Sequence, residues 1–238
     1  MNKLKKGDIV GRISYNKDVI FEITKIIQTS NKKQICILKG ITQRIEADSF
    51  IEDLELMDKR IVYEKIQTMD EQISKRIKSY INNSGNKLKN KFSLFLTNTK
   101  RSTLISNTGK ILHLDGDKRY SEKSMKYYKS LGLDAVVRNI PENKQPFLVR
   151  GLLDKYNPDI LVITGHDGMI KKGTGFSDIY NYRNSKYFIK TVYEARRDKI
   201  NGKELAIFAG ACQSFYEAII EAGANFASSP RKNNDRLY

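Results

Sequence analysis

The sequence predicts an α/β protein with a mainly parallel sheet and flanking helices, preceded by a small β-module and a helical linker. The first observation is a set of runs that are apolar at nearly every position, such as 159–164 and 205–211. Such runs are typical of parallel strands, because helices cover both faces of a parallel sheet. The second observation is that segments with helical periodicity separate these runs, which favours right-handed βαβ crossovers.

Residues 1–57 are expected to form the small β-module, because short alternating segments there are separated by turn signals. The expected strands are 8–14, 19–28, 34–39 and 42–48. The run Lys6-Gly7-Asp8-Ile9-Val10-Gly11 is typical of the start of an SH3-like barrel, a fold that binds peptides, RNA or other domains. A packing module without a ligand is the alternative interpretation.

Residues 58–92 are expected to form a helical linker. Apolar residues recur three to five positions apart from Ile61 to Ile81, which predicts an amphipathic helix over 60–82. The Asn- and Gly-containing segment 82–86 is expected to end this helix, and the lysine-rich stretch after it to be an exposed linker.

Residues 93–238 are expected to form the α/β domain. Its predicted strands are 110–115, 135–139, 159–164 and 205–211, and its predicted helices are 121–131, 144–156, 184–196 and 213–222. Residues 224–229 begin like one further strand.

The composition limits the classes of function. No apolar stretch approaches the length of a membrane span and the N-terminus lacks a secretory apolar core, so we expect a cytoplasmic protein without membrane insertion. Two cysteines agree with a reducing compartment and exclude a cysteine-rich zinc site, and we expect neither a metal nor a cofactor. The net charge of +16 indicates acidic or polyanionic partners, or only a solvated basic surface.

The clearest chemical signals are His166 and Cys212, each of which follows an apolar run and lies in a turn of small residues. Functional groups in parallel sheets gather at the carboxyl ends of the strands. A cysteine and a histidine at this edge provide a thiol nucleophile and its base. Cys212 is also expected to begin the helix 213–222, where the helix dipole favours the thiolate. An inert thiol and a turn histidine are the alternatives.

The other histidine and cysteine have structural interpretations. Cys36 lies in a short strand-like run, where a free cysteine behaves as a small buried hydrophobe. His113 lies within a predicted strand, which favours a core residue with satisfied hydrogen bonds. Asp167 follows His166 directly, but neighbouring residues in an extended chain point to opposite sides. The group that orients His166 therefore stays open.

Several motifs, in order along nearly the whole chain, resemble the sporulation-specific YabG peptidase family. They are the runs 6–10, 111–117, 164–168, 209–214 and 223–230. A strand ending in His with a nearby Gly, then a later strand ending in Ala-Cys, is also similar to caspase-, legumain-, gingipain- and clostripain-like cysteine peptidases. The matching residues here are His166, Gly168, Ala211 and Cys212. In the caspase-like pattern Gly follows His directly, whereas Asp167 intervenes in this chain.

The resemblance implies a caspase-like fold and a cysteine endopeptidase that processes spore coat and cortex-related proteins next to Arg or Lys. It places the enzyme in the mother cell of a sporulating bacterium, associated with the forming coat. Cys212 would be the nucleophile and His166 the proton-transfer group, with the N–H groups of Gly168 and Cys212 forming the oxyanion hole. The candidates for the carboxylate of the S1 pocket are Asp115, Asp117 and Asp178, for which turn chemistry or helix capping is the alternative.

Protein substrates are the expected partners, and self-cleavage is expected at Lys87–Lys91 or Arg196–Arg197. The glycine-rich loop 165–175 lacks phosphate-binding fingerprints and is expected to be an active-site flap. The alternative function is a non-catalytic basic protein that binds nucleic acid or a spore-coat scaffold. The barrel strands lack clustered aromatic platforms with Arg or Lys, so nucleic acid is not the expected partner. Family members usually continue for several dozen residues beyond Tyr238, so a truncated or a processed chain is expected.

Overall fold

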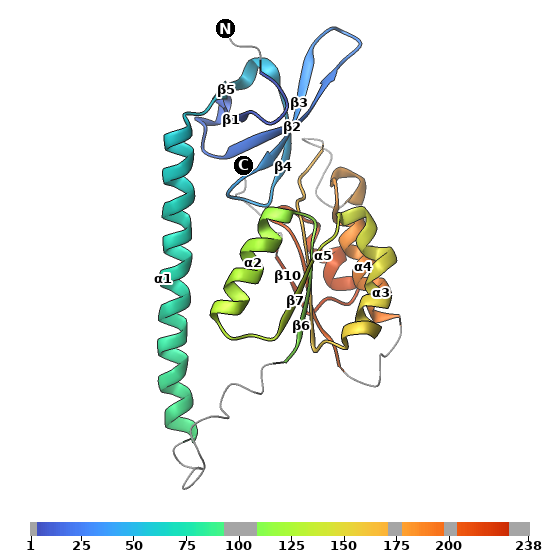
Figure 1. Cartoon of the computed structure of the whole chain (residues 1–238). Helices are drawn as coiled ribbons and strands as arrows, with labels where there is room; N and C mark the ends of the chain where they lie inside the picture. The colour runs from blue at the N-terminus through green and yellow to red at the C-terminus, as the bar shows by residue number, and fades with distance from the viewer. Residues whose placement is uncertain (1–3, 93–108, 171–177, 198–203, 229–238) are drawn as a thin grey trace.

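The computed structural model describes residues 4–92, 109–170, 178–197 and 204–228, with the backbone alone for 80–92. These residues form an antiparallel five-stranded sheet, a long helix and a parallel five-stranded sheet with flanking helices. The antiparallel sheet, called here the N-terminal sheet, lies over one edge of the parallel, C-terminal sheet (Figure 1). The predicted α/β class, with a parallel sheet between helices and a preceding β-module, is confirmed.

The N-terminal sheet has the strand order β4-β3-β2-β1-β5. Its strands are β1 (Ile9–Arg12), β2 (Ile20–Gln28), β3 (Gln34–Gly40), β4 (Glu46–Phe50) and β5 (Leu54–Leu56). Its core contains Val10, Ile23, Cys36 and Leu38, all fully buried, so the expected structural role of Cys36 is confirmed. The expected strand 42–48 begins too early, because residues 41–44 bend away from the sheet before β4 starts.

Helix α1 (Lys59–Phe92) is longer than the sequence predicted. It continues through Gly85 and includes the lysine-rich stretch that was expected to be an exposed linker, so that expectation is wrong. One glycine within a helix is unfavourable by only about 1 kcal/mol relative to alanine. An ion pair between Asp70 and Lys123 joins α1 to helix α2 (Lys118–Ser130). Within the described residues, no helix combines the length and the apolar character that crossing a bilayer requires.

The C-terminal sheet is parallel throughout and has the order β10-β9-β8-β6-β7. Its strands are β6 (Ile111–Asp115), β7 (Ala135–Asn139), β8 (Ile160–Thr164), β9 (Ala206–Gly210) and β10 (Phe226–Ala227). The helices are α2 (Lys118–Ser130), α3 (Gln145–Tyr156), α4 (Ser185–Arg196) and α5 (Tyr216–Glu221). Helix α2 covers one face, and α3, α4 and α5 cover the other (Figure 1).

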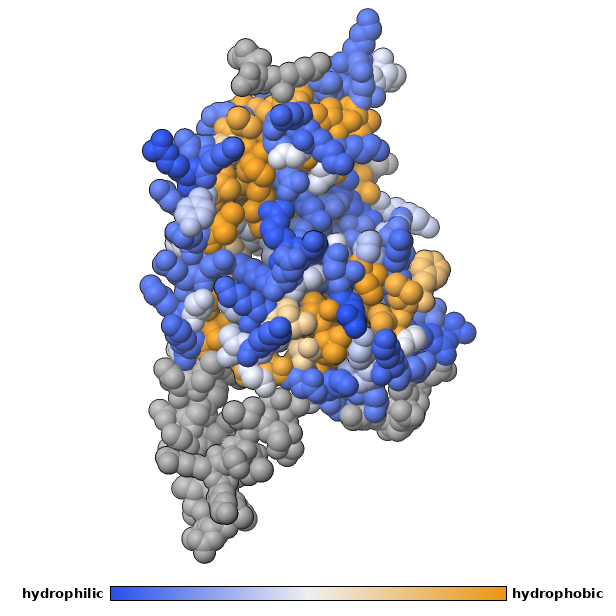
Figure 2. Space-filling view, viewed as in Figure 1, coloured by the Kyte–Doolittle hydropathy of each residue, from blue (hydrophilic) through white to orange (hydrophobic). Residues whose placement is uncertain are grey.

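The hydrophobic core of this region lies between the sheet and helices α3 to α5, and includes Leu114, Leu161, Ile163, Phe188 and Ile207. Hydrophilic side chains cover most of the visible surface, with apolar patches over the N-terminal sheet and over the C-terminal sheet and its helices (Figure 2). The predicted strands match the observed ones closely because they contain nearly continuous apolar runs, as in Ile160–Thr164 and Ala206–Gly210.

Candidate active site

The candidate residues lie at the carboxyl ends of three neighbouring strands. Asp115 is the last residue of β6, His166 follows the end of β8 by two residues, and Cys212 follows the end of β9 by two residues. The strand ends are level, because Asp115 pairs with Thr164 and Thr164 pairs with Gly210. The chain order reverses direction between β6 and β8, the position at which open α/β sheets bind their ligands.

Cys212 is exposed in an irregular turn between β9 and α5. The Ala211 N–H donates to the Ser214 hydroxyl at 2.9 Å, and the Phe215 N–H donates to the Ser185 hydroxyl at 2.8 Å. These bonds replace the first turn of the expected helix, which begins only at Tyr216. The prediction that Cys212 lies at a helix N-terminus is therefore wrong, and the helix dipole gives no argument for a thiolate.

His166 is fully buried. Its ring nitrogen Nε2 lies 3.3 Å from the Gly40 carbonyl oxygen, and since a carbonyl only accepts, Nε2 carries the proton. The other nitrogen, Nδ1, lies 3.8 Å from Asp117 Oδ2 and has no hydrogen-bond partner among the described residues. Burial, followed by the charge of Lys39, lowers the pKa of His166 to about 4. The imidazole is neutral at physiological pH in this arrangement.

The backbone of His166 is fixed from two sides. Its N–H donates to Glu142 Oε1 at 2.8 Å, and its carbonyl accepts from Asn184 Nδ2 at 2.8 Å. Burial raises the pKa of Glu142. A Cβ atom on Gly165 would lie only 2.2 Å from Glu142 Oε1, so glycine is required for the carboxyl group to reach the His166 amide.

Asp167 organises the loop and does not orient His166. Its carboxylate accepts from the Gly168 N–H at 2.9 Å, the Asn184 N–H at 2.8 Å and the Ser185 hydroxyl at 2.5 Å. Burial raises the pKa of Asp167. The Gly168 N–H, one of the two expected oxyanion donors, is therefore engaged with Asp167 in this structure.

Asp115 is completely buried and binds a guanidinium. Arg44 donates from Nη1 to Oδ1 at 2.9 Å and from Nη2 to Oδ2 at 2.7 Å. The Thr164 hydroxyl also donates to Asp115, at 3.0 Å, and in turn accepts from His113 Nε2 at 2.7 Å. His113 Nδ1 accepts from the Tyr128 hydroxyl at 3.2 Å, which confirms the interpretation of His113 as a satisfied core residue.

The other two S1 candidates cap helices, which is the alternative that the sequence left open. Asp117 accepts from the N–H groups of Arg119 and Tyr120 at the start of α2, and it also pairs with Lys39 at 2.9 Å. Asp178 is exposed and accepts from the Tyr180 N–H at 2.9 Å in the short 3-10 helix Ile179–Asn181. Asp115 and Asp117 thus lie together at the site, whereas Asp178 caps a separate turn.

Sequence reasoning missed five residues that complete the site: Lys39, Gly40, Arg44, Tyr120 and Glu142. Tyr120 packs edge-on against His166, with ring centroids 5.6 Å apart, and the Arg44 guanidinium lies 4.1 Å above its ring. Burial raises the pKa of Tyr120 to about 12, against the opposing effect of the Arg44 charge. No local pattern could have found Arg44, because its partner Asp115 is 71 positions away.

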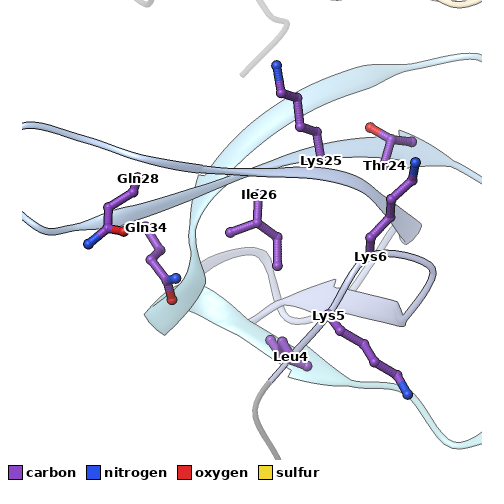
Figure 3. Close-up of a pocket in the computed structure, with 8 residues that line it drawn as sticks. All are labelled: Leu4, Lys5, Lys6, Thr24, Lys25, Ile26, Gln28 and Gln34. Carbon is purple, nitrogen blue, oxygen red and sulfur yellow. The ribbon is translucent and has the colours of Figure 1, made fainter.

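A hollow elsewhere on the molecule is separate from these groups. It lies on the N-terminal sheet, with Ile26 between the flanking side chains of Lys5, Lys6, Lys25 and Gln34 (Figure 3). It contains none of the candidate catalytic residues.

The fold and the site define an α/β protein in which a thiol and an imidazole lie at the ligand-binding edge of a parallel sheet, the groups used by cysteine hydrolases. The YabG peptidase U57 family matches residues 5–235, and the chain belongs to that peptidase family. A similar protein is the sporulation-specific protease YabG of Bacillus subtilis (strain 168). The two are 41% identical over an alignment of 239 residues, gaps included, that covers 96% of this chain and 79% of that protein. No solved structure matches. The predicted peptidase activity is confirmed, which disfavours the non-catalytic alternative.

Proposed function

We propose that this chain is a cysteine endopeptidase of sporulating cells, with Cys212 as the nucleophile and His166 as the proton-transfer group. The observation that carries the proposal is the position of both residues just past the ends of adjacent parallel strands, with the Cys212 side chain exposed. The name of the Bacillus subtilis relative supports the role in sporulation.

The chemistry follows from these two groups. His166 takes the thiol proton of Cys212, and the resulting thiolate attacks the scissile carbonyl carbon. The C–N bond then breaks as His166 transfers this proton to the leaving amine. His166 then removes a proton from water, and the hydroxide hydrolyses the thioester and regenerates the thiolate. The Cys212 N–H is the first oxyanion donor, and such a donor contributes about 3 kcal/mol. The Gly168 N–H becomes the second donor when its hydrogen bond to Asp167 is replaced by one to the oxyanion.

The proposed specificity is for Arg or Lys before the scissile bond, with Asp115 as the S1 carboxylate. Support comes from the bidentate contact between Asp115 and a guanidinium, a planar fork geometry that Arg satisfies better than Lys. Asp117 lies beside it and adds negative charge. Asp178, exposed and engaged in capping, is the weakest of the three candidates.

The finer assignments complete the proposal. The N-terminal sheet would be an SH3-like module of residues 1–57, and residues 58–92 a helical linker to a caspase-like domain of 93–238. Substrates would be spore coat and cortex-related proteins in the mother cell. The self-cleavage candidates Lys87–Lys91 lie within α1, so cleavage there would require local unfolding, whereas Arg196 is the last residue of α4 and Arg197 follows it.

The proposal is tested with fluorogenic peptides that carry Arg, Lys, Asp or Leu before the scissile bond. We expect hydrolysis after Arg and Lys by the wild type, and a loss of about a thousandfold or more in Cys212→Ala. Cys36→Ala is the matched control, because Cys36 lies in the core of the N-terminal sheet and should leave activity intact. Hydrolysis that survives in Cys212→Ala would overturn the assignment of the nucleophile.

A further inference from the structure

We propose that the turn formed by residues 40–45, from the last residue of β3 to the start of β4, is a tethered substrate mimic that places Arg44 in the S1 pocket and keeps the peptidase latent. The inference rests on the proposed function, since it assigns the turn to the same site. The turn belongs to the N-terminal sheet, which lies over the carboxyl edge of the C-terminal sheet (Figure 1).

The Arg44 side chain makes the contacts expected of a bound substrate arginine. Both terminal nitrogens bind the fully buried carboxylate of Asp115, at 2.9 and 2.7 Å. The guanidinium also stacks on the Tyr120 ring, 4.1 Å from its centroid. A buried carboxylate, a planar fork and an aromatic wall together form a pocket that selects arginine.

The backbone around Arg44 also lies as a substrate would. The Arg44 carbonyl accepts from the Cys212 N–H at 3.4 Å, the donor assigned to the oxyanion hole. Beyond the Arg44–Ile45 peptide bond, Ile45 forms a parallel β-bridge with Asp167, and the Glu46 N–H donates to the Asp167 carbonyl at 2.9 Å. Such pairing of an extended segment with the edge of a site is a common mode of peptide recognition.

Gly168 permits this close approach of the turn. A Cβ atom at Gly168 would lie 1.9 Å from the Glu46 carbonyl oxygen, so any other residue would displace the segment that follows Arg44. The loop that carries His166 is therefore shaped to accept a backbone at this position.

The same turn blocks proton transfer by His166. The Gly40 carbonyl faces Nε2 at 3.3 Å, and the ring is fully buried beneath the turn. Lys39 pairs at 2.9 Å with Asp117, the carboxylate nearest to Nδ1. The imidazole then reaches neither a leaving amine nor a water molecule, so the turn stays bound and its Arg44–Ile45 peptide bond is not cleaved.

A tethered mimic competes with substrates at an effective concentration on the order of millimolar. Withdrawal of the turn would open the S1 pocket, expose His166 and free Asp117 from Lys39. Outside the turn, the ion pair between Arg119 and Glu22 at 2.9 Å is exposed and of a kind that contributes little stability. A second ion pair outside the turn joins Asp48 of β4 to Arg183, and the turn adds the contacts of Ile41 and Arg44 to the hold of the N-terminal sheet on the site.

The test compares the full-length wild type with Arg44→Ala, Arg44→Lys and the control Arg119→Ala. With an Arg-containing fluorogenic peptide, we expect Arg44→Ala to raise kcat/KM about tenfold or more, since charge-assisted hydrogen bonds that hold the mimic are lost. Arg44→Lys keeps the charge opposite Asp115 but loses the fork, so it should give a smaller increase. Arg119→Ala should match the wild type.

A second measurement does not depend on catalysis. Calorimetry with benzamidine, a planar cation that resembles the arginine head group, should show binding about tenfold tighter or more in Arg44→Ala than in the wild type. Adding Asp115→Asn should remove this gain. If circular dichroism shows that Arg44→Ala does not fold, the measurement is made on Arg44→Lys, for which a smaller increase in benzamidine affinity is expected.

The outcomes separate the two proposals. Folded Arg44 variants with wild-type kcat/KM and wild-type benzamidine affinity would overturn the mimic, even where hydrolysis depends on Cys212. Asp115-dependent benzamidine binding in Arg44→Ala, without any Cys212-dependent hydrolysis, would support occupancy of the pocket and overturn the proposed catalytic role.

Discussion

Replacing Asp167 by alanine should destabilise the protein strongly, because this buried carboxylate satisfies three donors at once. They are the Gly168 N–H, the Asn184 N–H and the Ser185 hydroxyl, at 2.9, 2.8 and 2.5 Å. A buried donor left unsatisfied is unfavourable by about 1–3 kcal/mol, and the Ser185 hydroxyl can rotate to another partner. We therefore expect Asp167→Ala to lower the free energy of unfolding by about 3–5 kcal/mol, a large part of the usual total.

Two variants control this prediction, and urea unfolding followed by circular dichroism measures it. Asp167→Asn keeps the shape and one acceptor oxygen, so its loss should be about 1–2 kcal/mol. Asp178→Ala removes one exposed capping bond to Tyr180 and should lose about 1 kcal/mol or less. The reasoning is refuted if Asp167→Ala is no less stable than Asp178→Ala while the slope of the unfolding free energy against urea concentration is unchanged.

Three further predictions concern acid stability, the turn before Cys212 and specificity. Burial lowers the pKa values of His113 and His166 from 6.5 to about 4, so the unfolded state binds more protons than the folded state between these two pH values. The free energy of unfolding should therefore fall by about 3 kcal/mol per histidine as the pH drops from about 7 to 4. An unchanged midpoint of urea unfolding over this pH range would contradict the prediction. Gly210→Ala should lower the free energy of unfolding by about 1–3 kcal/mol in urea unfolding, because φ at this position is +115°. The control Gly151→Ala lies in a helix with open space around the new Cβ atom, so it should be neutral or stabilising. Equal effects of the two substitutions would argue against backbone strain at Gly210. Asp115→Asn should reduce the kcat/KM ratio of Arg over norleucine peptides about a hundredfold, and a preserved ratio would move the S1 carboxylate elsewhere.

The C-terminal sheet could be predicted because its signals are local. Strand β7 (Ala135–Asn139) has the predicted bounds, and β6, β8 and β9 begin one residue later than predicted. Their apolar runs and the polar or small residues that end them are adjacent in sequence. The same logic placed His166 and Cys212 at one edge of the sheet.

The rest of the site could not be predicted because it depends on contacts between distant segments. Arg44 lies in a segment that looks like a strand, yet residues 41–44 leave the sheet to meet Asp115 and the Cys212 turn. Helix α5 starts later than its pattern indicates, because the Ser185 hydroxyl from another helix takes the Phe215 N–H. Helix α1 runs past Gly85, where a local breaker signal predicted its end.

Covalent labelling tests the central claim, that Cys212 is the nucleophile of an arginine-directed peptidase, most directly. The intact chain is treated with a peptidyl arginine fluoromethyl ketone, and the adduct is located by mass spectrometry. The account predicts one adduct per chain, at Cys212, that forms more slowly in Asp115→Asn and more rapidly in Arg44→Ala. An adduct at Cys36, or peptide hydrolysis that continues with Cys212 unlabelled, would contradict it.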